Sequence, residues 1–502
     1  MTNQERLQAN NEAIENIKET LSNKLASIKL ETKNISENGT YNASDDGVVG
    51  WNKIVVNVGG KEPIEIELPE VFAGTSTLYY VAVSDDKLLI SSASDGKRGL
   101  WLYNVNSKTL SLLRADTDSW QYFQQVSTTK WLLSSSYAYN GGVAVFDTEN
   151  DSFTLLYRGN SWQYFYQASN TKWLIGGSNN DDGVLLYNLD DNSLVKIYSI
   201  GRNWRYFQKV SDTKFLISSG HSAAESSGIL LYNLEDDTIT LIYNQDYGYA
   251  YFQQVSDFKW LISSDNTSGL LLYNLEDDSF VKVFDTYYRW RYFHQANNTK
   301  WLISSSSAGG ILLYNSEDNS CVQIYTSGYN WLYFQRVSET KSLIGSSNSD
   351  TGILLYNSED DSVTQIYSKK YNWQYFYQAS NTKWLINSSS SNTGILLYNS
   401  EDDSCVQIYN SGYNWTNIYQ VNDKKILLSC PSDMYVGILL CNLEDNSCKN
   451  IKGVGYNYDI FIPDIGNNCY ISGSDKSKTP RTFYYTESTD TIALVSYYIG
   501  EI

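Results

Sequence analysis

The stretch from Trp290 to Tyr325, WRYFHQANNTKWLISSSSAGGILLYNSEDNSCVQIY, decides the fold. It contains four short runs of aromatic, aliphatic and β-branched residues, which begin at Trp290, Lys300, Gly310 and Cys321. Serine, asparagine, aspartate and glycine separate the runs, and these residues favour turns. The stretch therefore predicts four consecutive β-strands.

The third of these runs, GILLYN, recurs along the chain. Its versions begin at Gly99, Gly142, Gly183, Gly228, Gly269, Gly310, Gly352, Gly394 and Gly437, in steps of 41 to 45 residues, and a decayed copy begins at Arg481. The run is apolar along its whole length, which is typical of a strand that is buried on both faces. The chain therefore contains about ten copies of one four-stranded unit.

A four-stranded repeat of this length resembles the blade of a β-propeller. The resemblance covers roughly residues 70–500 and concerns the architecture alone, since neither a Trp-Asp signature nor a repeated Gly-Gly pair is present. We predict an all-β fold in which residues 63–502 form a propeller of about ten blades. A single ring is favoured over two five-bladed rings, because the spacing of the repeats leaves no room for a linker.

A short helix is predicted before the repeats, over residues 1–33. Residues 4–31 contain no glycine or proline, and Leu7, Ile14, Leu21 and Ile28 recur every seventh residue. This spacing is typical of a coiled-coil seam and predicts a homo-oligomer, with three chains favoured. The alternative is a helix that packs on the surface of another protein.

Residues 34–62 are expected to form a β-hairpin. The string ISENGTYNASDDGVVGWNKIVVNVGG, residues 35–60, places two strand-like runs around a turn region rich in glycine and aspartate. ENGTYNA at 37–43, DG at 46–47 and KIVVNV from Lys53 resemble a module that recurs in virion and tail proteins of phages of Gram-positive bacteria. The resemblance implies a virion protein that is made in the bacterial cytoplasm and contacts other virion proteins through residues 1–60.

The composition excludes several classes of protein. The net charge of −19 disfavours binding to nucleic acid or to acidic lipid. No apolar run is long enough to span a membrane, and the polar N-terminus does not resemble a secretion signal. No CxxC pair indicates a zinc site, and we expect all six cysteines to be free thiols.

The loops that precede the first strand of each repeat are the candidate ligand site. Aromatic rings beside amides suit neutral sugars, because the C–H face of a sugar stacks on a ring while its hydroxyls take hydrogen bonds. The best-formed copies are Tyr329, Asn330, Trp331, Tyr371, Asn372, Trp373, Tyr413, Asn414 and Trp415. A tryptophan that recurs in every repeat is more often a packing residue, so Tyr and Asn are the stronger candidates.

Acidic turns between the third and fourth strands are a second candidate. They recur as Glu-Asp-Asp, for example before Thr238 and Ser362. Calcium binding is one interpretation, but no loop has a calcium-binding spacing. We therefore favour ordinary hairpin turns whose acids are solvated or pair with the lysines that begin the second strands, namely Lys214, Lys259, Lys300 and Lys383. The glutamines of the first strands, Gln124, Gln167, Gln208, Gln254, Gln295 and Gln378, are expected to line the channel.

Binding without catalysis is the predicted activity. Only two histidines occur, and every conspicuous acid belongs to a repeated turn, whereas a catalytic site is built once. No cofactor or metal is expected. The alternatives are a structural virion decoration or spacer without a ligand and, less favoured, a glycosidase. The predicted ligand is a neutral or weakly charged glycan on the host surface.

Overall fold

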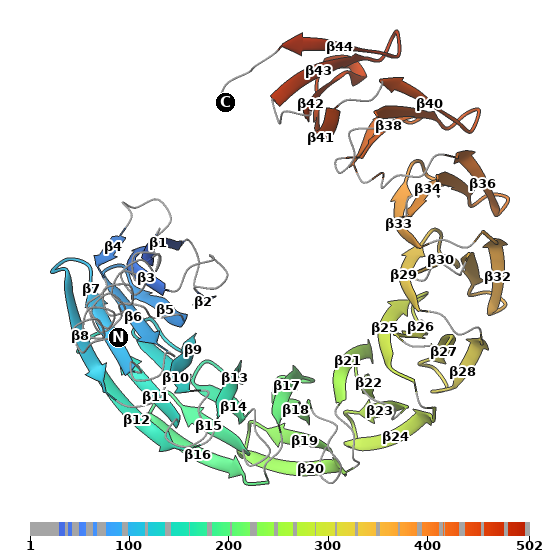
Figure 1. Ribbon diagram of the computed structural model, residues 1–502. Coiled ribbons are helices and arrows are strands. Elements are labelled where there is room, and N and C mark those ends of the chain that lie inside the picture. Colours follow the sequence, from blue (N-terminus) through green and yellow to red (C-terminus); the bar gives the residue numbers. More distant parts are fainter. Residues whose placement is uncertain are drawn as a thin grey trace, which may run out of the picture. The chain divides into compact units, whose positions relative to one another are not determined.

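The computed structural model confirms the repeated four-stranded architecture (Figure 1). It describes residues 30–35, 39–42, 50–56, 64–67, 77–92, 99–115, 119–135, 142–159, 161–177, 183–200, 203–220, 228–244, 249–264, 269–286, 288–306, 309–326, 330–347, 352–369, 372–388, 394–410, 415, 417–430, 437–452, 456–475 and 480–496. Within these ranges ten antiparallel sheets repeat the same order of four strands, which is the blade pattern of a β-propeller. No helix in these ranges is long and apolar enough to cross a membrane.

The chain divides into two compact units, Met1–Gly248 and Tyr249–Ile502. The arrangement of the blades in one ring therefore stays a prediction. In the first unit the repeated sheets are β5 (Thr77–Ser84), β6 (Lys87–Ser92), β7 (Gly99–Asn104) and β8 (Thr109–Arg114); β9 (Trp120–Gln125), β10 (Lys130–Ser135), β11 (Gly142–Asp147) and β12 (Ser152–Arg158); β13 (Trp162–Gln167), β14 (Lys172–Gly177), β15 (Val184–Asn188) and β16 (Ser193–Tyr198); and β17 (Trp204–Lys209), β18 (Lys214–Ser219), β19 (Gly228–Asn233) and β20 (Thr238–Asn244).

Six repeated sheets lie in the described part of the second unit. They are β21 (Tyr249–Ser256), β22 (Lys259–Ser264), β23 (Leu270–Asn274) and β24 (Ser279–Phe284); β25 (Trp290–Gln295), β26 (Lys300–Ser305), β27 (Ile311–Asn315) and β28 (Cys321–Tyr325); β29 (Trp331–Arg336), β30 (Lys341–Ser346), β31 (Ile353–Asn357) and β32 (Ser362–Tyr367); β33 (Trp373–Gln378), β34 (Lys383–Ser388), β35 (Ile395–Asn399) and β36 (Ser404–Tyr409); β37 (Asn417–Asn422), β38 (Lys425–Ser429), β39 (Ile438–Asn442) and β40 (Ser447–Lys452); and β41 (Tyr456–Pro463), β42 (Cys469–Asp475), β43 (Pro480–Thr486) and β44 (Thr491–Ser496). A 3-10 turn, η3 (Ile465–Asn467), precedes β42.

The N-terminal region differs from the predicted hairpin. β1 (Leu30–Ile35) pairs in parallel with β3 (Gly50–Val56), and β4 (Ile64–Glu67) pairs with the other edge of β3. β2 (Gly39–Asn42) instead pairs with β5, so the sheet of the first blade has a fifth strand. The two strands of the predicted hairpin therefore belong to different sheets. β2 pairs with β5 of the first blade, whereas β3 lies between β1 and β4.

The predicted helix lies mostly outside the described residues, and so do Leu7, Ile14, Leu21 and Ile28. Its last part is wrong, because residues 30–33 belong to the strand β1. Pairing with β3 gives the backbone of these residues its hydrogen bonds in the extended form.

Consecutive sheets within a unit share one apolar core. Trp331, at the start of β29, packs with Leu302 and Leu313 of the preceding sheet and with Leu354 of its own sheet. The second strands add a polar contact, in which the Ser304 hydroxyl donates to the Trp331 carbonyl of the next sheet. The same contact links Ser134 to Trp162 and Ser263 to Trp290, which explains why serines of the second strands are buried.

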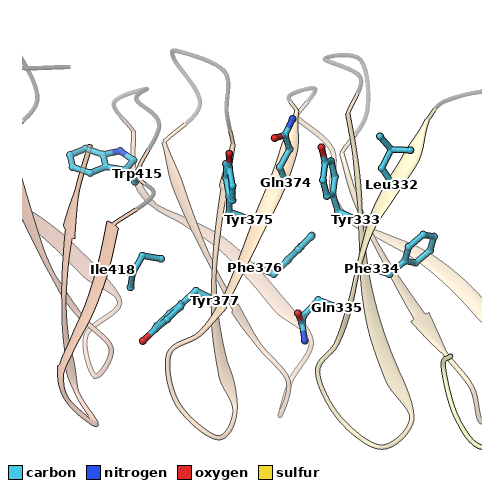
Figure 2. A pocket seen from close by; sticks show the side chains of 10 residues that line it. All are labelled: Leu332, Tyr333, Phe334, Gln335, Gln374, Tyr375, Phe376, Tyr377, Trp415 and Ile418. Atoms are coloured by element: carbon cyan, nitrogen blue, oxygen red, sulfur yellow. The ribbon is translucent and has the colours of Figure 1, made fainter. Parts of the chain in front are cut away.

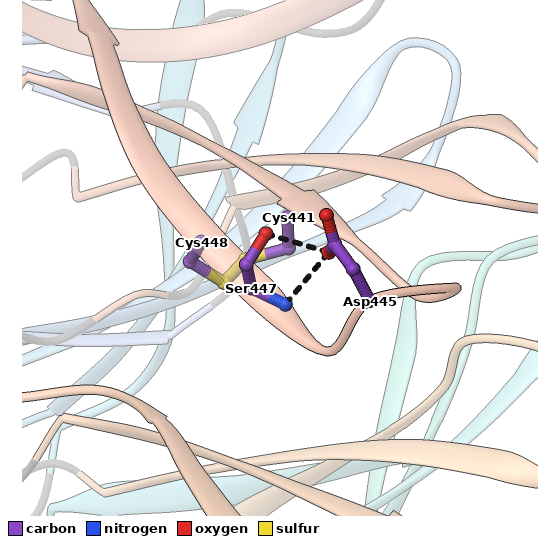
Figure 3. The surroundings of a disulfide bond; sticks show 4 residues. All are labelled: Cys441, Asp445, Ser447 and Cys448. Carbon is purple, nitrogen blue, oxygen red and sulfur yellow. Dashed lines mark hydrogen bonds between the residues drawn. A yellow bond between two sulfur atoms is a disulfide. The ribbon is translucent and has the colours of Figure 1, made fainter.

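Four cysteines are free thiols as predicted, but Cys441 and Cys448 form a disulfide. They face each other on the neighbouring strands β39 and β40, with a Cα–Cα distance of 4.0 Å. Between them, Asp445 accepts hydrogen bonds from the backbone N–H and the hydroxyl of Ser447, at 3.1 and 2.6 Å (Figure 3). The turn thus holds the two cysteines opposite each other.

Candidate ligand-binding surface

The tryptophans of the predicted loop site are core residues. Trp331, Trp373 and Trp415 are 1%, 0% and 0% exposed. Each ring meets the tyrosine that ends the preceding fourth strand edge-to-face, at 5.5, 5.5 and 5.9 Å between ring centroids. This burial supports the packing role, and a role in ligand binding stays a prediction.

The other residues of the predicted loop site are only partly described. Tyr329, Tyr371, Tyr413 and Asn414 lie outside the described residues. Asn330 and Asn372 are half-buried, and the Asn330 carbonyl accepts a hydrogen bond from the Ser347 N–H at 3.1 Å. A ligand site on these loops stays a prediction.

Several acidic turns pair with lysines of the preceding sheet, as the favoured interpretation predicts for Lys300, whereas Lys259 donates to the Ser316 carbonyl and Lys383 to Asn446. Lys300 contacts Asp361 at 2.6 Å, and the Tyr356 hydroxyl donates to the same carboxylate at 2.8 Å. Lys172 and Tyr232 hold Asp237 in the same way, and Lys341 and Tyr398 hold Asp403. We call this contact the Tyr-Asp-Lys latch.

The latch explains why aspartate occupies the last position of these turns. Its aspartates adopt left-handed backbone angles, with φ between 53° and 57° at Asp237, Asp278, Asp361 and Asp403, which aspartate and asparagine tolerate best. Burial, followed by the hydrogen bond to Asp361, raises the pKa of Tyr356. The carboxylates are thus used by this chain's own cation and hydroxyl, and within the described residues no group of three potential ligands could hold a metal.

A groove crosses the first strands of three consecutive sheets in the second unit. Its volume is about 450 Å³. Apart from Trp415, which precedes β37, the lining residues belong to β29, β33 and β37. They are Leu332, Tyr333, Phe334, Gln335, Gln374, Tyr375, Phe376, Tyr377, Trp415 and Ile418 (Figure 2). Trp415 borders it only as a buried wall.

A bulge at the start of β29 and of β33 shapes the groove. The pairing register shifts between Trp331 and Tyr333 in β29 and between Trp373 and Tyr375 in β33. Such a shift leaves an extra residue, here Gln374 in β33, and redirects side chains. In Figure 2 Gln374 lies between Tyr333 and Tyr375, whose hydroxyls point to the same side of the strands.

The groove presents neutral hydrogen-bonding groups on aromatic walls. None of its lining side chains is charged at neutral pH. Burial, followed by the neighbouring tyrosines, raises the pKa of Tyr333, and burial raises the pKa of Tyr377, so both hydroxyls keep their protons. Among the described residues the hydroxyls of Tyr333, Tyr375 and Tyr377 have no hydrogen-bond partner, and Tyr375 is 38% exposed. These hydroxyls are open to a ligand.

The first strands outside the groove include charged side chains beside aromatic rings. Arg205 lies over the ring of Tyr206 at 4.8 Å, in the first unit. The predicted glutamine positions are exposed or half-buried, and Gln124 and Gln208 donate to backbone carbonyls of their own strands, at 2.9 and 2.8 Å. The amides therefore help to fix the first strands.

The groove was not predicted from the sequence, although a signal for it was present. The Tyr-Phe pair recurs at the third and fourth positions of the first strands, for example at Tyr333–Phe334 and Tyr375–Phe376. Alternate residues of a strand face opposite sides. The repeated pair could thus have indicated an aromatic surface as well as a packing contact.

Comparisons with known proteins identify no family. No family model matches the chain, and neither does any curated protein. Among solved structures, the extracellular domain of a one-component system of B. thetaiotaomicron shows a TM-score of 0.27 and 10% identity, covering 89% of this chain and 68% of that chain. The dihydro-heme d1 dehydrogenase NirN in complex with DHE shows a TM-score of 0.33 and 10% identity, covering 68% and 76%. AztD from Citrobacter koseri shows 0.31 and 11%, covering 67% and 96%. At these scores the likenesses carry no argument about function.

Proposed function

We propose that this chain is a phage virion protein that binds a neutral glycan of the host surface through the groove on β29, β33 and β37. The observation that carries the binding proposal is the row of Tyr333, Gln374 and Tyr375, flat rings with an amide between them (Figure 2). Sugars use both features, since C–H faces stack on rings and hydroxyls bond to amides and phenols.

The charge of the groove supports a neutral ligand. An acidic sugar needs a cation to replace the water around its carboxylate, and no lysine or arginine lines the groove. The whole chain also carries a net charge of −19, which repels polyanions at long range. The ligand class is therefore an uncharged oligosaccharide.

Binding without turnover is part of the proposal. Glycoside hydrolysis needs two carboxyl groups placed on either side of the scissile bond. The groove lining contains none, and the acids of the latches, such as Asp361 and Asp403, hold lysines and tyrosines. The chemistry of the lining thus suits recognition.

The virion context rests on the sequence of residues 35–60, which resembles the phage module. We propose that residues 1–29 join three copies of the chain and that residues 1–60 contact other virion proteins. A truncation that tests this should begin at residue 30, because β2 completes the first blade by pairing with β5. The truncated chain is expected to be a folded monomer by light scattering, and a persistent trimer would contradict the oligomerisation proposal.

The glycan proposal is tested by the double variant Tyr333→Ala/Tyr375→Ala. Attachment of the purified full chain to host cells should fall by about tenfold or more, since each lost stacking contact contributes about 1 kcal/mol. The matched control is Val322→Ala/Val406→Ala, on the fourth strands β28 and β36, where the side chains are 50% and 42% exposed. The control should attach like the unaltered chain.

A second variant separates the groove from the loops. Tyr329, Tyr371 and Tyr413 changed together to alanine should leave attachment intact if the groove is the site. Loss of attachment in this variant, with retention in Tyr333→Ala/Tyr375→Ala, would assign the site to the loops. If the unaltered chain attaches to no host cell and to no glycan of an array, the spacer function replaces the proposed one.

A further inference from the structure

One end of the groove departs from the repeat at Ile418. Eight other first strands have phenylalanine at this position, namely Phe123, Phe165, Phe207, Phe252, Phe293, Phe334, Phe376 and Phe461. Ile418 lies on β37, next to Tyr377 of β33 (Figure 2). Isoleucine is smaller than the ring that stands at this position in other repeats, and Ile418 lines the groove.

Where the preceding first strand offers a ring, this phenylalanine stacks on it. Tyr166 stacks on Phe207 at 5.6 Å and 15°, and His294 on Phe334 at 5.4 Å and 13°. Tyr419 stacks on Phe461 in the same way, at 5.8 Å and 20°.

Tyr377 occupies the same strand position, but Ile418 gives it no ring to stack on. Within the described residues Tyr377 contacts no other aromatic ring. Its ring borders the groove together with Ile418. Part of its half-buried ring therefore borders the groove at the place where a ring of the next strand would cover it.

We propose that Tyr377 and Ile418 form a subsite for the acetamido group of an N-acetylated sugar. This inference rests on the proposed glycan-binding function and names the substituent that the groove selects. An acetamido group is planar, uncharged and ends in a methyl group, so its plane stacks on Tyr377 while the methyl packs on Ile418.

The size of the space fits this group. The side chain of phenylalanine has more heavy atoms than that of isoleucine, and an acetamido group has more heavy atoms than the hydroxyl that it replaces. These two differences are equal. The group thus fills the volume that the missing ring leaves. The neutral lining, which includes Gln335, imposes no unpaired charge on it.

The test compares chitotetraose with cellotetraose, which differ only in the acetamido group at the second carbon of each sugar. Isothermal titration of the full chain should show chitotetraose binding about tenfold tighter or more, the discrimination expected from a filled small apolar pocket. Ile418→Phe restores the residue of the other repeats and should abolish this preference.

Two further variants keep the test independent of folding. Tyr377→Gln introduces the residue found at the equivalent positions Gln124, Gln208, Gln253 and Gln335, removes the stacking face without filling the space and should also abolish the preference. Lys449→Thr, on the fourth strand β40 of the sheet that contains Ile418, is the control and should keep the preference for chitotetraose. Circular dichroism checks that each variant is folded.

The outcomes separate the two proposals. An unaltered chain that binds both tetrasaccharides equally, or an Ile418→Phe variant that still prefers chitotetraose, would overturn the acetamido subsite and leave the glycan-binding function standing. If the chain binds neither tetrasaccharide, the subsite is overturned, while the attachment assay with Tyr333→Ala/Tyr375→Ala decides the function separately.

Discussion

Removing the carboxylate of Asp361 tests the Tyr-Asp-Lys latch between two sheets of the second unit. This carboxylate accepts hydrogen bonds from Lys300 at 2.6 Å and from the Tyr356 hydroxyl at 2.8 Å. Lys300 also donates to the Ser358 carbonyl at 2.8 Å, so it keeps one partner when Asp361 is changed. The latch therefore has separable parts.

The expected destabilisation can be summed from these parts. The Tyr356 hydrogen bond to a charged acceptor contributes about 1.5 kcal/mol. The pair with Lys300 contributes about 0.5 kcal/mol, because the Lys300 and Asp361 side chains are 18% and 40% exposed. Alanine at a φ of 57° adds about 1 kcal/mol of backbone strain. Asp361→Ala should thus lower the free energy of unfolding by about 3 kcal/mol.

Two other substitutions of Asp361 separate the backbone strain from the loss of the carboxylate contacts. Asp361→Gly removes the backbone strain and should cost about 2 kcal/mol. Asp361→Asn should cost about 1 kcal/mol, because asparagine keeps the left-handed conformation and the acceptor oxygen. The preceding repeat shows that this arrangement is possible, since the Tyr314 hydroxyl donates to Asn319 at 3.1 Å and Asn319 has a φ of 59°.

Urea unfolding followed by tryptophan fluorescence measures these differences. A double-mutant cycle of Lys300→Met with Asp361→Asn should give a coupling energy of about 0.5 kcal/mol or more. Glu359→Ala, at an exposed position in the same turn, is the control and should change stability by less than about 0.5 kcal/mol. Equal costs for alanine, glycine and asparagine, with no coupling to Lys300, would refute the latch.

Three further predictions concern the core, pH and the disulfide. Trp331→Ala should lower the free energy of unfolding by about 4 kcal/mol, as measured in urea, because this fully packed ring joins two sheets. Burial, followed by Arg336, lowers the pKa of His294 from 6.5 to about 4. Because the pKa of His294 is lower in the folded than in the unfolded chain, this contribution to the free energy of unfolding is present above pH 6.5 and is lost as the pH falls towards 4. In thermal melts, His294→Gln should remove up to about 3 kcal/mol of this loss. Replacing Cys441 and Cys448 by serine should cost about 2 kcal/mol and remove the sensitivity of the urea midpoint to reductant.

Most of the fold prediction rested on the repeated sequence. Strings such as GILLYN mark a strand that is buried on both faces, and each of its copies forms the third strand of a sheet. The pairing of β2 with β5 was missed, because the sequence between 39 and 56 suggests a local hairpin and carries no mark of the distant partner. Strand existence is local information, whereas strand partnership is decided by the whole fold.

The disulfide was missed for a geometric reason. Equivalent cysteines of different blades were compared, but the relevant partner lies on the neighbouring strand of the same hairpin. Cys441 takes the position of Tyr398, and Cys448 that of Cys405, which faces Tyr398 in the preceding sheet. An alignment of facing positions within one repeat would have revealed the pair.

The groove was not predicted because aromatic residues have two uses in this repeat. Trp331 and Tyr333 are separated by one residue, yet the first is 1% exposed and the second borders the groove. The bulge between them decides which ring is buried. Sequence patterning gives no signal for this bulge, whereas the change from phenylalanine to Ile418 is visible by comparing the repeats.

The central claim is that a glycan binds on the first strands of the second unit. A crystal structure of the full chain soaked with chitotetraose tests it most directly. Our account predicts sugar rings over Tyr333 and Tyr375, with an acetamido group against Tyr377 and Ile418. A tetrasaccharide bound at the loops of Tyr329, Tyr371 and Tyr413, or anywhere else while this groove stays empty, would contradict it.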